Sequence, residues 1–225
     1  KKAKKMDVKE RIACRVAQEL KQGDVVNLGI GLPTLVPNYL PSDVTITLQS
    51  ENGLLGMGPL QGQPVPNLTN AGGKPCGTLP GAAFFDSAMS FSIIRGGHVD
   101  ATVLGGLQVD QHGSLANWMV PGKMVPGMGG AMDLVSGAKK VVVAMEHCTR
   151  DGGSKVLKTC TLPLTARSKV NTLITEYAVF KFKEGKMLLT EYAPGLSVEA
   201  VRAVTEAEFE VSPDCHEMDL SLLTR

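Results

Sequence analysis

The sequence has few aromatic residues, no strong excess of charge of either sign and no long apolar run. Aromatic residues make up 4% of the 225 positions, so the core must consist of aliphatic side chains and methionine. Acidic and basic residues nearly cancel, to a net charge of +1, which argues against nucleic acid as a partner. No apolar run approaches the roughly 20 residues of a membrane-spanning helix, so no membrane association is expected.

Paired cysteines and metal-binding spacings are also absent from the sequence. The five cysteines are scattered and include no CxxC pair, a pattern typical of reduced thiols in a cytoplasmic protein. The four histidines lack the spacing of metal ligands, so no metal site is predicted. Residues 1–6 form a short basic leader, and we expect one domain over residues 7–225.

The pattern of apolar residues alternates along the chain between helical and strand periods. Helices are predicted between Asp7 and Gly23, from near Pro33, and over residues 86–94, 131–135 and 197–204. Strands are predicted over residues 25–28, 45–49, 99–109, 140–145, 172–182 and 187–192. Residues 56–81 are rich in glycine and proline and are predicted to be a long ordered loop.

This order of elements predicts a single α/β domain. Its sheet should be open and mixed but largely parallel, with helices on both faces. The antiparallel part is expected around the Glu184-Gly185 turn, which joins two of the predicted strands.

The most informative stretch is Ser50-Glu51-Asn52, a polar triplet that follows a predicted strand directly and is closed by Gly53. Ligands of open α/β sheets bind at the carboxyl ends of strands, and the apolar residues 54–57 would partly desolvate a carboxylate there. Desolvation makes a carboxylate a better nucleophile. On position alone, a glutamate that merely hydrogen-bonds within a polar turn is an equally good interpretation.

The segment LQSENGLLG, residues 48–56, resembles the active-site signature of the family I CoA-transferases, in the β subunit or C-terminal half. The resemblance continues in order along nearly the whole chain and is greatest to the bacterial β subunits that act on acetate and acetoacetate. The further matching segments are NAGG (70–73), LPG (79–81), IRGGHV (94–99), ANW (116–118), PGKM (121–124), GMGGAMD (127–133), MEH (145–147) and CTLPLT (160–165). The fold it implies is that of CoA-transferases and related isomerases.

The resemblance implies transfer of CoA from a short-chain acyl-CoA to a free carboxylate or 3-oxo acid, such as acetate, acetoacetate or butyrate. In its ping-pong mechanism, Glu51 would be the nucleophile and would carry CoA as a thioester. The amide of Gly130 would donate to the oxyanion; without the resemblance, the Gly127–Gly130 turn is better interpreted as close packing of a helix on the sheet. CoA is a substrate, and no cofactor is implied. A CoA-transferase α subunit would complete the site, in an α2β2 assembly.

The resemblance also implies which residues lie near CoA and the substrate. Asn27 would bond the pantetheine arm, and Lys74 would meet a phosphate of CoA as a point charge. The other expected binding residues are Gly29, Gly31, Asn52 and Gly129.

Two other functions remain open on the residues alone. A sugar-phosphate isomerase would use Glu51 as a general base, but it would want a Lys/Arg cluster near residues 29–34, and none is present. A non-catalytic metabolite-sensing module would normally carry a pair of DNA-binding helices, and residues 7–22 supply only one.

Overall fold

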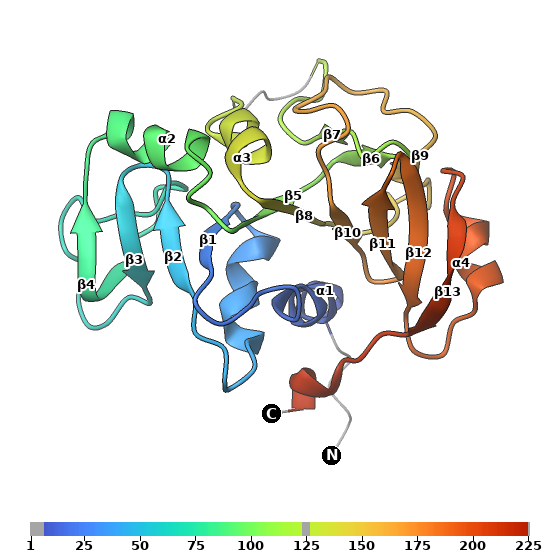
Figure 1. Cartoon of the computed structure of the whole chain (residues 1–225), viewed down its shortest axis with the longest axis horizontal. Helices are drawn as coiled ribbons and strands as arrows, with labels where there is room; N and C mark the ends of the chain where they lie inside the picture. Colours follow the sequence, from blue (N-terminus) through green and yellow to red (C-terminus); the bar gives the residue numbers. More distant parts are fainter. Residues whose placement is uncertain (1–6, 123–126, 225) are drawn as a thin grey trace.

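The computed structural model describes residues 7–122 and 127–224, and the predicted basic leader lies outside this part. The main sheet has ten strands in the order β13-β12-β11-β10-β8-β5-β1-β2-β3-β4, and a smaller sheet has the order β7-β6-β9 (Figure 1). The helices are α1 (Val8–Ala17), η1 (Leu32–Tyr39), α2 (Ser87–Arg95), α3 (Ala131–Gly137), α4 (Val198–Val204) and η2 (Ser221–Thr224), of which η1 and η2 are 3-10 helices. No helix of the described ranges is long and apolar enough to cross a bilayer.

The main sheet is parallel at its centre and has antiparallel pairs on both sides of the centre, while its edge strand β13 pairs in parallel with β12. Strands β10, β8, β5, β1 and β2 pair in parallel, whereas β3 and β4 on one side and β11 and β12 on the other pair antiparallel. The strands are β1 (Val25–Leu28), β2 (Thr47–Ser50), β3 (Leu54–Gly58), β4 (Gly77–Phe84), β5 (Ala101–Gly105), β8 (Lys140–Ala144), β10 (Thr172–Ile174), β11 (Ala178–Lys183), β12 (Lys186–Tyr192) and β13 (Glu210–Glu217). The smaller sheet consists of β6 (Gln108–Asp110), β7 (Leu115–Ala116) and β9 (Val156–Leu157).

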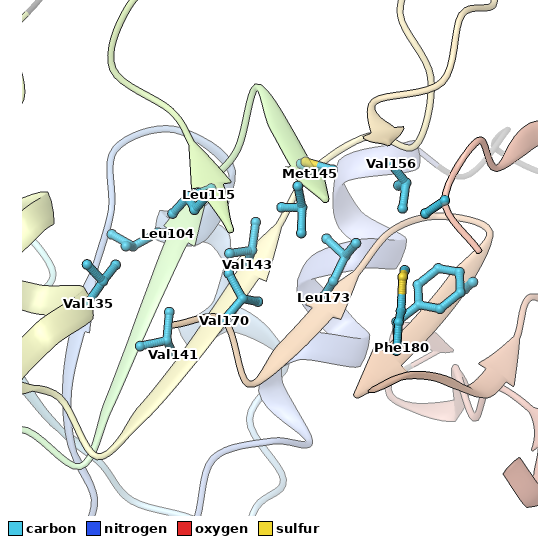
Figure 2. Packing of buried hydrophobic residues seen from close by; sticks show 14 of the residues in the cluster. Leu104, Leu115, Val135, Val141, Val143, Met145, Val156, Val170, Leu173 and Phe180 are labelled. Atoms are coloured by element: carbon cyan, nitrogen blue, oxygen red, sulfur yellow. The ribbon is translucent and has the colours of Figure 1, made fainter. Parts of the chain in front are cut away.

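Two hydrophobic clusters cover the two faces of the main sheet. The cluster that contains Val142 packs against α1 and η1. The cluster that contains Val141, Val143 and Phe180 packs against α2, α3 and α4, and Figure 2 shows part of it. Neighbouring valines of β8 thus point to opposite faces, as the pleat of a strand requires, and both faces are apolar because both are covered. The predicted mixed α/β sheet with helices on both faces is confirmed.

The predicted loop over residues 56–81 is wrong at both of its ends. Strand β3 continues to Gly58 and strand β4 begins at Gly77, so only residues 59–76 run between the two strands. Positive φ angles at Gly56 and Gly81 interrupt the alternating pattern that identifies a strand. Strand β4 also contains Pro80, which a sheet accepts at an edge, where no partner needs its missing N–H.

Two of the predicted strands each correspond to two separate strands in the structure. The prediction over residues 172–182 joined β10 and β11, which pair antiparallel around a turn at Thr175. The hydroxyl of Thr175 accepts hydrogen bonds from the N–H groups of Tyr177 at 3.2 Å and Ala178 at 3.1 Å, and these bonds hold the turn. The prediction over residues 99–109 joined β5 to β6, which belongs to the smaller sheet.

A buried ion cluster ties the first helix to the sheet. The guanidinium of Arg15 on α1 donates to both carboxylate oxygens of Glu191 on β12, at 2.6 Å and 2.5 Å, and to Glu19 at 2.9 Å. Lys140, at the start of β8, pairs with the other oxygen of Glu19. Because Arg15 and Glu191 are nearly inaccessible to water, each charge depends on its partner inside the fold.

A second buried polar group is His147, which follows β8 and is fully buried. Its ring nitrogens each lie 2.9 Å from a threonine hydroxyl, Nδ1 from Thr175 and Nε2 from Thr205. Burial, with a smaller contribution from the positive charge of Lys155, lowers the pKa of His147 from 6.5 to about 4. In the unfolded chain the ring takes up a proton below about pH 6.5, whereas in the folded chain it stays neutral to about pH 4.

The unfolded chain therefore binds more protons in this window, and stability should fall as pH drops from about 6.5 towards 4, by up to about 3 kcal/mol from this one group. His147→Gln removes the titration, so the variant should lose less stability than the unmodified chain between pH 7 and pH 4.5. Chemical denaturation at the two pH values measures the difference. His112→Gln, at an exposed histidine, is the matched control, and an equal pH dependence in all three proteins would contradict the prediction.

Candidate active site

Glu51 lies in the turn that joins β2 to its antiparallel neighbour β3, at the carboxyl end of β2. In Figure 1, β2 runs towards the end of the sheet where α2 lies. The turn is tight because Gly53 has a φ of 117°, and a Cβ atom there would lie 2.0 Å from the carbonyl oxygen of Phe85. The Gly53 carbonyl in turn accepts a bond from the Phe85 N–H at 3.0 Å. Glycine is therefore required for the turn that holds Glu51.

Asn27, from the neighbouring strand β1, bonds the Glu51 carboxylate. Its Nδ2 lies 3.0 Å from Glu51 Oε2 and also donates to Gln49, at 2.7 Å to Oε1 and at 3.2 Å to the main-chain carbonyl. Asn27 is 1% exposed, and its Oδ1 has no hydrogen-bond partner among the described residues. The residue predicted to touch CoA is thus a direct partner of the predicted nucleophile.

Gly130 reaches the same carboxylate from another part of the chain. It is the N-cap of α3, as the sequence predicts, and is buried. A Cβ atom at Gly130 would lie 3.3 Å from Cγ of Glu51 and 3.3 Å from the ring of Phe91 on α2. The main chain of Gly130 therefore packs directly on Glu51, with little space for any side chain between them.

A cavity of about 560 Å³ opens beside Glu51. Four of the predicted site residues line it together, namely Glu51, Gly29, Gly31 and Lys74. The remaining wall is mainly apolar and includes Leu28, Ile46, Leu48, Met57 and Leu79. Asn27, Asn52, Gly129 and Gly130 do not line this cavity, although Asn27 and Gly130 contact Glu51 from its other sides.

Asn52 is exposed and holds the loop that carries Lys74. Its Nδ2 donates to the carbonyl of Thr69 at 2.7 Å, and the Ala71 N–H donates to the hydroxyl of Ser50 at 3.0 Å. Both neighbours of Glu51 thus anchor residues 69–71, and Lys74 follows three residues later at the cavity wall. Ser50 was not predicted to be an anchor, although its place beside Glu51 in a polar triplet pointed to such a role.

Comparison with known proteins identifies the family. The family model for coenzyme A transferase matches residues 9–203. The acetate CoA-transferase subunit beta of Escherichia coli (strain K12) is 67% identical over 209 residues, which are 93% of this chain and 96% of that protein. The chain belongs to the coenzyme A transferase family. The predicted CoA-transferase is therefore confirmed, and the isomerase and sensing-module alternatives are set aside.

A longer relative and a solved structure agree with this assignment. The succinyl-CoA:3-ketoacid coenzyme A transferase 2A of Rattus norvegicus is 50% identical over 212 residues, which are 92% of this chain but only 41% of that protein. The crystal structure of an acyl-CoA transferase from Escherichia coli O157:H7 has a TM-score of 0.77 at 24% identity, over 96% of this chain and 44% of that one. That likeness shows the shared fold. Relatives of the chain's own length are named as beta subunits, which implies a partner subunit.

The turn at Gly53 gives a direct test of how the site is held. Gly53→Ala should lower the free energy of unfolding by more than about 2 kcal/mol, because its φ is positive and its new Cβ meets a carbonyl oxygen. Gly62→Ala is the matched control, because Gly62 also has a positive φ but no atom within 4 Å of the added Cβ, and should cost about 1 kcal/mol. Urea denaturation measures the free energy of unfolding of both variants. Equal losses would contradict the prediction that the contact with the Phe85 carbonyl adds to the cost at Gly53.

Proposed function

We propose that this chain is the catalytic β subunit of an enzyme that moves CoA from a short-chain acyl-CoA to a free carboxylate, with Glu51 as the nucleophile. The observation that carries the proposal is a half-buried carboxylate at the wall of a mainly apolar cavity, bonded through one oxygen to Asn27. Such a carboxylate is oriented and partly screened from water while one oxygen stays available to react.

The chemistry requires two attacks at a carbonyl carbon. Glu51 attacks the acyl-CoA thioester, expels the CoA thiolate and forms a mixed anhydride with the acyl group. The thiolate then adds to the glutamyl carbonyl and expels the first carboxylate, which leaves CoA on Glu51 as a thioester. An acceptor carboxylate reverses these steps. A carboxylate suits this exchange because it also leaves readily, so neither intermediate is a deep trap.

The bond from Asn27 assigns the two oxygens of Glu51 different parts. Oε2 accepts from Asn27 Nδ2, so Oε1 is the oxygen that attacks the thioester. Oε2 then becomes the carbonyl oxygen of the glutamyl group, and negative charge develops on it when the thiolate adds. A hydrogen-bond donor is already in place at that atom, which is the condition for effective stabilisation of an oxyanion.

Gly130 is proposed as the donor to the oxyanion of the acyl group. Support comes from the close packing of its main chain on Glu51, which keeps a backbone amide near the reacting carbons without an intervening side chain. Gly129, which precedes it with a φ of 53°, is the proposed support for that turn. No cofactor is needed in this mechanism, because CoA enters as a substrate.

The binding of CoA is assigned to the cavity and the loop beside it. Lys74 is the proposed contact of a CoA phosphate, and the mainly apolar wall suits a pantetheine arm and a short acyl chain. Gly29 and Gly31 have no side chains and would let CoA come close to the backbone at the cavity wall. Asn52 would hold the loop that carries Lys74 in place. The names of the relatives favour acetate and 3-oxo acids as substrates.

A partner subunit is proposed to cover this site. Most of the exposed large apolar side chains lie around it, and we call them the apolar rim: Ile30, Leu60, Leu79, Phe84, Met89 and Met132. Three of them line the cavity, and the others lie at the end of β4 and at the starts of α2 and α3. An α subunit seated on the rim, in an α2β2 enzyme, would exclude the water that hydrolyses an anhydride or thioester.

Chemical trapping tests the nucleophile. The two-subunit enzyme is incubated with acyl-CoA, treated with hydroxylamine or borohydride and digested, and the modified residue is found by mass spectrometry. Glu51 should carry the modification, and Glu51→Gln should lose both label and activity because an amide is a far poorer nucleophile. Glu146→Gln, at an exposed glutamate after β8, is the control and should label normally. Label on another residue, or activity in Glu51→Gln, would refute the assignment.

The apolar rim gives a separate prediction about assembly. The chain alone should show no transferase activity, and addition of the α subunit should restore it. Phe84→Ser and Met89→Ser should each weaken association by about tenfold or more, as expected when an apolar side chain is lost from an interface. Val211→Ser, on β13 at the opposite edge of the sheet, should leave affinity unchanged. Transfer by the isolated chain, or normal affinity in both rim variants, would contradict the predicted interface.

A further inference from the structure

A buried chain of polar side chains leads away from Glu51 through Asn27, and the proposed reaction gives its further members, Gln49 and Ser90, no part. Asn27 donates from Nδ2 to Oε1 of Gln49 at 2.7 Å, and Gln49 donates from Nε2 to the hydroxyl of Ser90 on α2 at 3.1 Å. Asn27, Gln49 and Ser90 are each at most 1% exposed. They come from β1, β2 and α2, so the chain of bonds links two central strands to the helix above them.

The orientation of each amide in this chain follows from its neighbours. The main-chain carbonyl of Gln49 and the carboxylate of Glu51 can only accept hydrogen bonds, so the atom of Asn27 that faces both must be Nδ2. The atom of Gln49 that faces Nδ2 must then be the acceptor Oε1, which leaves its Nε2 directed at the hydroxyl of Ser90. One arrangement of donors and acceptors therefore accounts for every hydrogen bond of this chain, with Oδ1 of Asn27 left without a partner among the described residues.

We propose that Gln49 and Ser90 are positioning residues for the transferase reaction, which hold the Asn27 amide in the orientation that bonds Glu51. This inference rests on the proposed role of Glu51. Ser90 accepts from Gln49 Nε2 and so holds the glutamine side chain in place, and the donor Nδ2 of Asn27 requires that the glutamine carbonyl face it. Asn27 in turn keeps its NH₂ on Oε2, which leaves Oε1 to face the thioester. Gln49 also lines the cavity beside Glu51, but its side chain bonds Asn27 and Ser90 and not the carboxylate.

The energetics favour a positioning role over simple packing. Burial of an amide costs free energy unless its hydrogen bonds are made, and an apolar pair would fill the same space without that cost. Ser90 is also followed on α2 by Phe91, whose ring limits the space at Gly130. One turn of α2 thus reaches both Gln49, which bonds Asn27, and the glycine that packs on Glu51.

The test is a kinetic double-mutant cycle in the assembled two-subunit enzyme. Gln49→Met keeps the size of the side chain but removes both hydrogen bonds. It should lower kcat by roughly tenfold to a hundredfold, the scale of a small misplacement of a reacting group, with little change in KM for acyl-CoA. Ser90→Ala, a small change within a helix, should give a smaller loss of kcat in the same direction.

The cycle separates positioning from general damage to the fold. If Gln49 acts through Asn27, then Gln49→Met should cause almost no further loss in an Asn27→Ala background. Thr102→Val is the matched control, because Thr102 pairs in register with Asn27 on β5, is fully buried and has a hydroxyl without a partner in the described chain. The kcat of Thr102→Val should stay within about twofold of that of the unmodified enzyme, because the substitution removes no hydrogen bond.

The rate at which the Glu51–CoA thioester forms, measured by rapid quench and mass spectrometry, is the second readout. It should fall in Gln49→Met and in Ser90→Ala in proportion to kcat. Full additivity with Asn27→Ala, an equal loss in Thr102→Val, or wild-type thioester formation in both variants would overturn the inference. The unmodified enzyme, run in parallel, separates the two proposals: if it never forms a thioester on Glu51, the proposed nucleophile fails first.

Discussion

The parallel pairing of β1 with β2 is the constraint on which the site depends. Its register sets Asn27 beside Gln49, and the carboxylate two residues beyond Gln49 then falls 3.0 Å from the Asn27 amide. A shift by one residue would turn Asn27 to the opposite face of the sheet, against α1, and would remove this bond. The covered apolar faces of the sheet resist such a shift, so the hydrophobic core fixes the geometry of a polar site at its edge.

The same bond balances two opposing effects on Glu51, the proposed nucleophile. A hydrogen bond to a charged group contributes about 1.5–3 kcal/mol, and it stabilises the Glu51 anion before the reaction as well as orienting it. The bond therefore lowers the reactivity of the carboxylate, but it fixes the direction in which the carboxylate faces a substrate. The apolar wall of the cavity acts the other way, because it keeps water from solvating the free oxygen. A carboxylate that is hydrogen-bonded at one oxygen and faces an apolar wall at the other is both oriented and reactive.

The sequence predicted most where a local signal and the final structure agree. Asp7, Asp86 and Ser197 cap three helices at or near the predicted starts, because a cap depends on neighbours only a few residues away. Strands β3 and β4 were not predicted, because glycine and proline interrupt their apolar pattern. Strand β13 was not predicted either, because Pro213 and the charged residues of the strand hide its alternation. Glu51, Asn27 and Gly130 were predicted as site residues from the family resemblance, and the structure brings all three together. Gln49 and Ser90 were not found, since their bond joins residues 41 positions apart; the only trace was a polar Ser90 one helical turn before the buried Ile94.

The ion cluster of α1 has a consequence for how the chain reaches its native state. Arg15 and Glu191 are 176 residues apart, so the ribosome makes helix α1 long before it makes Glu191 on β12, the main acceptor of the Arg15 guanidinium. At ordinary rates of synthesis, roughly 5–20 residues per second, the guanidinium waits on the order of ten seconds or more for that partner. Until then α1 cannot settle on the sheet with its guanidinium fully paired, because Glu19 accepts only one of the hydrogen bonds that Arg15 makes in the native state. Closure of this face is therefore a late event in biogenesis, and a chaperone that shields the apolar side of α1 would act in that interval.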